Sequence, residues 1–208
     1  MASVFESKHP LIHEKIAALR SIETTPPNFR ALVRILGTLL GVEATTHLPT
    51  RSRTVRTPLG DAMGREVDGP LAIVPILRAG LGMADGLLDL IPDAQVWHIG
   101  LFRDEHTLKP TEYFNRVPQD SQARIALVAD PMLATGGSAV RACEILRDSG
   151  VSDIRYLCLI AAPEGIDRLS SAMPEVPIYA GAIDERLTEI GFIYPGLGDA
   201  GDRQFATD

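Results

Sequence analysis

Short apolar runs alternate with helical patterns from residue 70 onward, and this alternation leaves few folds open to the chain. The runs cover residues 71–77, 96–101, 125–129, 154–162 and 176–182. Runs of this length that end at turn residues are typical of strands buried on both faces. Strands separated by helices pair in parallel, and the helices cover the sheet. The sequence therefore predicts an α/β fold with a mostly parallel sheet flanked by helices.

The first 69 residues are expected to supply helices and an arm. Apolar side chains recur at helical spacing from Leu11 to Leu19 and from Phe29 to Leu40, and Gly41 is expected to end the second helix. The basic segment 51–58 is rich in β-forming residues. No aromatic residues interleave with its charges for base stacking. A solvated edge strand or a dimer arm is therefore preferred to a nucleic-acid contact.

Composition restricts the class of protein. The chain has 208 residues, of which 45% are hydrophobic and 23% charged, as in a single globular domain. The 20 basic and 27 acidic residues give a net charge of −7, which argues against a protein that coats nucleic acid. Cys143 and Cys158 are too few for a disulfide framework or a CxxC metal site. The N-terminus lacks the apolar centre of a signal peptide and no run has membrane-spanning length, so we expect a cytoplasmic location.

The residues after the run at 125–129 carry the main functional signal. Asp130 ends the run, and a loop of small residues at 134–138 leads into a helical pattern that stops at Gly150. Adjacent glycines let backbone N–H groups converge on one anion, and the helix dipole adds to this. Thr135 and Ser138 can donate to phosphate oxygens, whereas Asp130 suits sugar hydroxyls. An ordinary turn with a capping serine is the alternative, but the combination favours a ligand with a phosphate and a ribose.

Other phosphate-binding motifs do not fit this loop. It contains neither the G-x4-G-K-S/T pattern nor the GxGxxG pattern, so nucleotide triphosphatase and dehydrogenase functions lose their main support.

Two arginines are expected at the edge of the sheet where ligands bind, beyond the carboxyl ends of the strands. Arg78 follows the run at 71–77 among small residues, so its planar fork can bind a diphosphate opposite the phosphate loop, two strands away. Alone, Arg78 is equally well explained as a surface residue near a turn. Arg103 begins the long polar connection 102–118, which has the length of a lid or binding loop.

The tail at 184–208 is dense in glycine, yet residues 192–194 and 197 are aromatic or aliphatic. Such side chains would be wasted on solvent, so an ordered loop is favoured over a flexible linker. Glycines let backbone N–H and C=O groups approach a flat base. Asp184 and Glu185 are interpreted as surface groups, since they have no partner at acid/base spacing.

Two segments resemble a known family. Residues 130–138, Asp-Pro-Met-Leu-Ala-Thr-Gly-Gly-Ser, resemble the phosphoribosyl-diphosphate loop of type I phosphoribosyltransferases. That loop usually has two adjacent acidic residues, and Pro131 in the second position is similar to one branch, the uracil phosphoribosyltransferases. Residues 191–202, Gly-Phe-Ile-Tyr-Pro-Gly-Leu-Gly-Asp-Ala-Gly-Asp, resemble the uracil-binding segment of that branch. The resemblance extends over nearly the whole chain and is weakest before residue 70.

The resemblance implies a single type I phosphoribosyltransferase domain over 1–208. It would have N-terminal helices and an arm at 1–69, a core sheet at 70–183 with a flexible hood hairpin at 102–118, and a base-binding tail at 184–208. The implied enzyme is a pentosyltransferase that moves ribose 5-phosphate from 5-phospho-α-D-ribose 1-diphosphate to N1 of uracil, giving UMP and diphosphate in pyrimidine salvage. The alternatives are a purine phosphoribosyltransferase and a nucleic-acid-binding regulator that senses phosphoribosyl diphosphate on the same fold.

The resemblance also implies roles for particular residues. The expected catalytic groups are Arg78, Arg103 and Asp130. The residues expected to bind phosphoribosyl diphosphate are these three, Asp199, and the loop residues Pro131, Met132, Leu133, Ala134, Thr135, Gly136, Gly137 and Ser138. Those expected to bind uracil, largely through the backbone, are Ile193, Gly198, Asp199 and Ala200. Tyr194 is bulkier than the aliphatic residue expected there.

Partners and cofactor follow from the same resemblance. Mg²⁺ is expected to arrive with the diphosphate of the donor, because no cluster of hard oxygen ligands is evident in the sequence. No dedicated nucleophile is evident, which is consistent with direct displacement, and Asp199 is the nearest candidate for the base that accepts the N1 proton. A homodimer or higher homo-oligomer is implied. GTP is an allosteric activator in some members, and the sequence identifies no GTP site.

Overall fold

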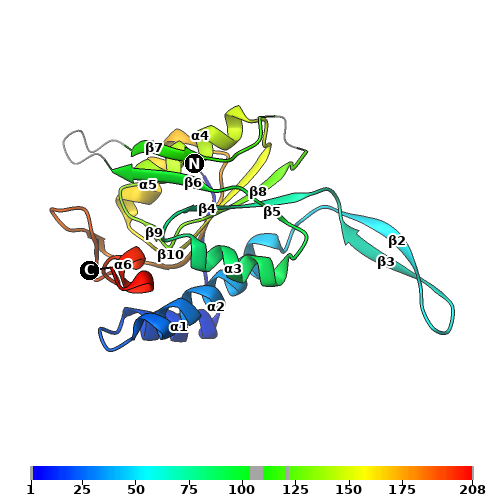
Figure 1. Ribbon diagram of the computed structural model, residues 1–208, viewed down its shortest axis with the longest axis horizontal. Helices are drawn as coiled ribbons and strands as arrows, with labels where there is room; N and C mark the ends of the chain where they lie inside the picture. Colours follow the sequence, from blue (N-terminus) through cyan, green and yellow to red (C-terminus); the bar gives the residue numbers. More distant parts are fainter. Residues whose placement is uncertain (1, 104–109, 120–121, 208) are drawn as a thin grey trace.

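A computed structural model of the chain describes residues 2–103, 110–119 and 122–207 (Figure 1). Its helices are α1 (Pro10–Arg20), α2 (Pro26–Thr45), α3 (Leu81–Leu90), α4 (Gly137–Asp148), α5 (Pro163–Ala172) and α6 (Ala200–Phe205). Its strands are β1 (Val4–Glu6), β2 (Thr50–Arg56), β3 (Asp61–Val67), β4 (Leu71–Leu77), β5 (Gln95–Val96), β6 (Ile99–Arg103), β7 (Pro110–Asn115), β8 (Ile125–Ala129), β9 (Met132–Leu133), β10 (Asp153–Ala161), β11 (Ile178–Ile183), β12 (Arg186–Leu187) and β13 (Ile193–Tyr194).

The central sheet has the strand order β1-β11-β10-β8-β4-β6-β7, with β5 paired to β4 and β9 paired to β10. Each of these pairings is parallel except that of β6 with β7. The predicted parallel sheet is therefore confirmed. The order corrects one expectation, because β4 lies directly beside β8, with Pro75 opposite Ala129. The arginine loop and the phosphate loop consequently follow adjacent strands and not strands two apart.

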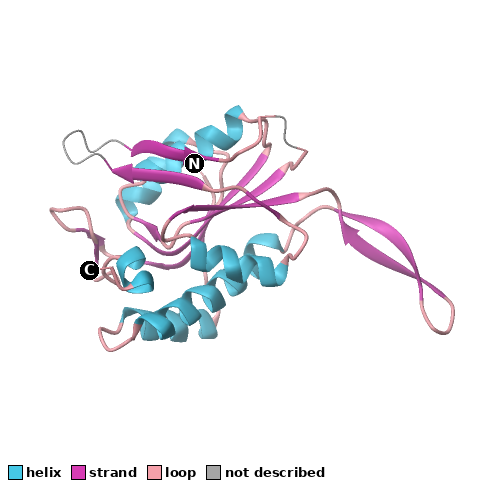
Figure 2. Ribbon diagram, viewed as in Figure 1, coloured by secondary structure: helices cyan, strands magenta, loops and turns pink. Residues whose placement is uncertain are grey.

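Helices cover both faces of the sheet, as Figure 2 shows. Alternate side chains of each strand point to opposite faces. On one face, residues such as Val74 and Val128 pack in a buried cluster with α4 and α5. On the other face, residues such as Ile73 and Leu127 pack in a second cluster with α1, α2 and α3. Burial on both faces explains why the strands are apolar throughout.

Two predicted boundaries were wrong. The second helix does not end at Gly41 but continues to Thr45. A Cβ on Gly41 would lie 2.5 Å from Cδ2 of Leu87, so this glycine lets α2 pack closely against α3 and does not terminate the helix. The run at 96–101 is divided between β5 and β6, because the buried Trp97 lies between two short pairings with β4.

The segment after α2 forms an arm. Strands β2 and β3 make an antiparallel hairpin that projects from the body at the right of Figure 1. Leu59 at its tip is fully exposed, and Met63 is 72% exposed. This agrees with the expected solvated strand or arm. In the described part of the chain, no helix has the length and apolar character needed to cross a membrane.

Candidate functional site

The predicted phosphate loop, residues 130–138, has the local structure that the sequence predicts. Strand β8 ends at Ala129, and the loop that follows surrounds a cavity of about 90 Å³ at the start of α4. The cavity is lined by Asp130, Met132, Leu133, Ala134, Thr135, Gly136, Gly137, Ser138, Ala139 and Tyr156. Every predicted loop residue except Pro131 therefore contributes to one cavity, and Ala139 and Tyr156 join them. Because α4 begins here, its unpaired N–H groups and the positive end of its dipole belong to the same place.

Gly136 is required for the shape of this loop. It precedes α4 with φ of 75°, a left-handed conformation that side chains disfavour. A Cβ at this position would lie 2.9 Å from the carbonyl oxygen of Gly165 and 3.1 Å from Cβ of Arg168. Arg168 also donates a 3.3 Å hydrogen bond to the carbonyl oxygen of Thr135, which places a positive charge behind the loop.

The first residues of the loop are hydrogen-bonded to the sheet. The carbonyl oxygen of Pro131 accepts hydrogen bonds from the N–H groups of Leu159 and Ile160 on β10, at 3.0 and 3.1 Å. Met132 and Leu133 form β9, which pairs with the same strand. Pro131 therefore holds the loop against the sheet, and the residues that follow it face the cavity.

Asp130 lies at the edge between the cavity and the core. Oδ2 of its carboxylate accepts a 3.0 Å hydrogen bond from the hydroxyl of Tyr156. Burial raises the pKa of Asp130 to about 6, against the lowering effect of the bonds from Tyr156 and the Met132 N–H. At neutral pH the carboxylate is mostly ionised, so it can accept hydrogen bonds from sugar hydroxyls, as the sequence predicts.

Arg78 follows the adjacent strand β4 at the same edge of the sheet. The Leu77–Arg78 peptide bond is cis. Gly80 in this turn packs against the carbonyl oxygen of Ala129, so a side chain there would collide with the end of β8. The Arg78 guanidinium is exposed and lies outside the 90 Å³ cavity. Its Nη2 donates to Oδ1 of Asp202 at 3.2 Å, which brings it to the C-terminal tail.

The C-terminal tail is ordered, as predicted. After β13, Gly196 and Gly198 adopt φ values of 66° and 80°, and Asp199 caps the N-terminus of α6 by accepting a 2.9 Å hydrogen bond from the Asp202 N–H. A Cβ on Gly201 would lie 3.2 Å from Oδ1 of Asp199 and 3.9 Å from Nη2 of Arg78. The tail and the arginine loop therefore meet at this glycine.

Four predicted base-binding residues surround this turn. Ile193 and Ala200 are buried, whereas Gly198 and Asp199 are exposed. The carbonyl oxygen of Ala200 already accepts a 3.0 Å hydrogen bond from Nε2 of Gln204. Its N–H, in the first turn of α6, has no partner within the helix.

Asp184 is a correction to the sequence analysis, because it is buried and not a surface group. Its carboxylate receives two hydrogen bonds from Arg20 of α1 and a 3.0 Å hydrogen bond from the N–H of Gly196. Arg20 also donates to the carbonyl oxygen of Gly196 at 2.8 Å. Arg203 of α6 makes a parallel contact, donating to the carbonyl oxygen of Leu197 at 2.7 Å. We call residues 195–199, between β13 and α6, the glycine turn. Hydrogen bonds with Arg20, Asp184 and Arg203 hold it at Gly196 and Leu197.

The hood is described only in part. Strands β6 and β7 form an antiparallel hairpin, with Phe102 opposite Thr111, so a hairpin begins where one was predicted. The residues between them, 104–109, and the side chain of Arg103 lie outside the part that the structure describes. Arg103 nevertheless ends β6, which pairs with β4, so its backbone lies at the same edge of the sheet as Arg78.

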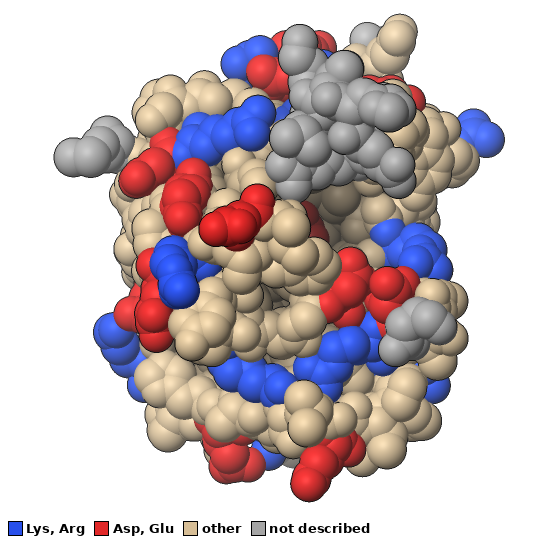
Figure 3. All heavy atoms as spheres, turned by 90° about the vertical axis from the view of Figure 1, so that its left-hand side faces the viewer, with Lys and Arg blue, Asp and Glu red and all other residues tan. Residues whose placement is uncertain are grey.

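One side of the molecule collects these elements. Figure 3 looks onto it and shows a hollowed surface with acidic and basic side chains on both sides of the hollow. Tyr156, Ala139 and Asp202 are present although the sequence analysis did not select them. The sequence does contain a signal for Tyr156, because it is a residue with a hydroxyl on a strand face that is otherwise apolar.

Comparisons with known proteins agree over the whole chain. The family model for uracil phosphoribosyltransferase matches residues 6–207. The uracil phosphoribosyltransferase of Dictyoglomus thermophilum is 54% identical over 200 residues, covering 96% of this chain and 97% of that protein. The one from Roseiflexus castenholzii is 52% identical over 207 residues, covering 100% of each.

Solved structures share the fold of this chain. The AQ2163 protein from Aquifex aeolicus superimposes with a TM-score of 0.93 at 36% identity, covering 99% of each chain. A hypoxanthine-guanine phosphoribosyltransferase from Bacillus anthracis has a TM-score of 0.52 at 12% identity, covering 76% of this chain and 80% of that one. The second likeness concerns the fold alone, which is that of type I phosphoribosyltransferases. From the family match and the full-length relatives together, the chain belongs to the uracil phosphoribosyltransferase family.

Proposed function

We propose that the protein transfers ribose 5-phosphate from phosphoribosyl diphosphate to N1 of uracil, producing UMP and diphosphate. The observation that carries this proposal is the family match over residues 6–207, together with the meeting of three loops at one edge of the sheet. The phosphate loop, the arginine loop and the glycine turn correspond to the three parts of the reaction, which are the donor phosphate, the leaving diphosphate and the base.

The 5-phosphate is assigned to the 90 Å³ cavity. Its volume suits a phosphate group, and its lining offers N–H groups at the start of α4 and the hydroxyls of Thr135 and Ser138. The carboxylate of Asp130 at the edge of the cavity accepts hydrogen bonds from the ribose hydroxyls. With the phosphate and the ribose hydroxyls both held, the sugar is fixed in position for the transfer at its C1 atom.

The leaving diphosphate is assigned to Arg78, with Arg103 as the second arginine. As the C1–O bond breaks, negative charge grows on the diphosphate, and a planar guanidinium can stabilise it through paired hydrogen bonds. Nη2 of Arg78 lies 3.2 Å from Oδ1 of Asp202. This ion pair is exposed, so the diphosphate can take the place of the Asp202 carboxylate. Mg²⁺ is proposed to enter bound to this substrate, whose oxygens are the ligands it prefers. Among the described residues, no three His, Cys, Asp or Glu side chains are grouped as metal ligands.

The base is assigned to the turn between β13 and α6. Gly198 leaves backbone groups accessible, and the N–H of Ala200 is available for a carbonyl oxygen of uracil. Asp199 stands beside Gly201 and Arg78, so it faces the donor or its metal as well as the base. This position also makes Asp199 the candidate acceptor of the N1 proton.

We further propose a cytoplasmic homo-oligomer. The projecting arm, with exposed apolar side chains at Leu59 and Met63, is the candidate subunit contact. Sedimentation of the wild type beside a variant with Met63→Asp measures whether the arm joins subunits. GTP remains a candidate activator with no assigned site, and the assay below is to be run with and without it.

The decisive assay incubates the pure protein with phosphoribosyl diphosphate, Mg²⁺ and one base at a time. We expect UMP from uracil and no nucleotide from hypoxanthine or guanine. Formation of IMP or GMP in place of UMP would contradict the proposal and favour the purine enzyme. Binding of the donor without any product would favour the regulator.

A further inference from the structure

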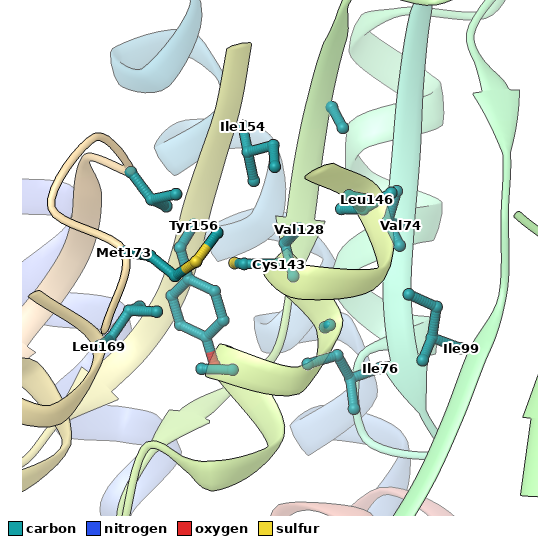
Figure 4. Close-up of a cluster of buried hydrophobic side chains, with 14 of the residues drawn as sticks. Val74, Ile76, Ile99, Val128, Cys143, Leu146, Ile154, Tyr156, Leu169 and Met173 are labelled. Carbon is teal, nitrogen blue, oxygen red and sulfur yellow. The ribbon is translucent and has the colours of Figure 1, made fainter. Parts of the chain in front are cut away.

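The hydroxyl of Tyr156 reaches the candidate site from inside the hydrophobic core. Tyr156 lies on β10, and its side chain is fully buried. Figure 4 shows its ring beside Cys143, Leu169 and Met173, with the hydroxyl pointing away from Cys143 and Met173. A buried tyrosine hydroxyl needs a hydrogen-bond partner, and here the partner is Oδ2 of Asp130 at 3.0 Å.

This packing fixes the position of the hydroxyl. The ring is enclosed by side chains from α4 and from the α5 segment, so it cannot follow a movement of Asp130. The hydroxyl therefore acts as a fixed point for one oxygen of the carboxylate, and the Met132 N–H bonds to the same group. Because Asp130 and Tyr156 both line the 90 Å³ cavity, a ligand bound there lies within reach of the carboxylate that the hydroxyl holds.

We propose that Tyr156 is a positioning residue, whose hydroxyl orients the Asp130 carboxylate toward the ribose hydroxyls of the donor. The inference rests on the proposed function, since it concerns the same donor. It assigns a role to a core side chain that is separated from Asp130 by 26 positions in the chain. A hydrophobic residue of the same size would fill the core equally well, so the hydroxyl itself needs this explanation.

The surrounding groups make the effect measurable. Burial raises the pKa of Tyr156 well above its ordinary value, so it remains a hydrogen-bond donor. Burial also raises the pKa of the Cys158 thiol on β10. On α4, burial raises the pKa of Cys143 to about 12, and the negative charges of Glu175 and Glu144 add to this shift. Both thiols are therefore neutral near pH 7. Beside these two thiols and the Tyr156 hydroxyl, the Asp130 carboxyl has a pKa of about 6, so its charge changes in the pH range where the enzyme can be assayed.

The test replaces the hydroxyl alone. In Tyr156→Phe the ring keeps its packing, but Asp130 loses a bond that lowers its pKa. We expect the acid limb of kcat/KM for phosphoribosyl diphosphate to move up by about one pH unit, and KM for this donor to rise about tenfold at pH 7. KM for uracil should remain unchanged. Tyr179→Phe is the matched control, because Tyr179 is stacked on Phe5 away from the site, and it should follow the wild-type profile.

A double-mutant cycle separates positioning from general damage. The donor's own phosphate also titrates near pH 6, but it contributes equally to every variant. When Tyr156→Phe is added to Asp130→Asn, the donor KM should change by less than about twofold, because the carboxylate that the hydroxyl orients is gone. Thermal unfolding checks that each variant is folded. If Tyr156→Phe does not fold, Tyr156→Met provides the same test, since its flexible side chain fills the space without a hydroxyl.

Two results would overturn the inference. One is a Tyr156→Phe profile and donor KM equal to those of Tyr179→Phe, and the other is an undiminished effect of Tyr156→Phe in the Asp130→Asn background. A wild-type protein that forms no UMP is a different outcome, since it contradicts the proposed function. In that case calorimetry of the same four variants with phosphoribosyl diphosphate alone decides whether Tyr156 orients Asp130.

Discussion

Arg20 near the N-terminus donates hydrogen bonds to both carboxylate oxygens of Asp184, which lies 164 positions further along the chain. The two side chains enclose Gly196, because Arg20 binds its carbonyl oxygen and Asp184 binds its N–H. The glycine turn assigned to the base is thereby fastened to α1. The precision of this turn depends on an ion pair that lies outside the site.

We expect Arg20→Ala to weaken both stability and uracil binding. The Asp184 side chain is only 5% exposed, so removing Arg20 leaves a buried carboxylate without its partner, at a cost of about 3 kcal/mol in the free energy of unfolding. The loosened turn should raise KM for uracil several-fold and leave KM for the donor nearly unchanged. Urea unfolding and steady-state kinetics measure the two effects.

The matched control is Arg34→Ala. Arg34 also forms a two-pronged pair, with Asp89, but both side chains are about half exposed. Solvent screens such a pair, so its loss should leave the unfolding midpoint and both KM values close to the wild type. Equal losses in the two variants would show that the tail is not held by Arg20.

Gly136→Ala should damage the phosphate site through geometry alone. The left-handed conformation costs about 1–2 kcal/mol for a residue with a side chain, and the added methyl would meet Gly165 and Arg168. We expect KM for phosphoribosyl diphosphate to rise more than about tenfold, because the loop must move to accommodate the methyl group.

Gly150→Ala separates the effect of the left-handed backbone conformation from the effect of the steric contact. Gly150 has a similar φ of 88°, but a Cβ there would meet no atom within 4 Å. It should lose about 1–2 kcal/mol of stability through backbone conformation and keep wild-type donor binding. A Gly136→Ala enzyme with normal donor KM would contradict the assignment of the cavity to phosphate.

Arg78→Lys tests the arginine loop. Lysine keeps the charge but lacks the planar fork that pairs with two phosphate oxygens, so we expect kcat/KM for the donor to fall about 10²-fold, with kcat falling as well. Arg51→Lys on the arm, where the arginine pairs with Glu66, should change neither constant. A rise in donor KM without any fall in kcat would mean that Arg78 binds the ground state and the transition state equally, and would contradict its role in stabilising the leaving diphosphate.

The raised pKa of Asp130 has a consequence for stability. Its folded-state pKa of about 6 lies above the ordinary 3.8, so the folded protein disfavours the ionised form. Stability from this residue is therefore fully present below about pH 4 and is lost as the pH rises through 6, by at most roughly 3 kcal/mol. Asp130→Asn should unfold at a higher temperature than the wild type at pH 8, and this gain should shrink at pH 5. Calorimetric scans at the two pH values measure the unfolding temperatures. An equal gain at both pH values would contradict the raised pKa of Asp130.

Local patterns determined much of this protein from the sequence alone. The apolar runs predicted the parallel sheet, and the sequence from Ile125 to Gly150 predicted a strand, a loop and a helix that the structure confirms. These features depend on neighbours along the chain, because strand burial, glycine conformation and helix ends are set within a few residues.

What only the tertiary structure decided concerns partners that are distant in the chain. Sequence reasoning placed β4 two strands from β8, ended the second helix at Gly41 and left Asp184 on the surface, and each of these was wrong. A periodic pattern records which residues are buried but not which side chains they meet. The pairing of Asp184 with Arg20 and of Tyr156 with Asp130 depends on the strand order and on helix packing, so it exists only once the whole sheet has formed.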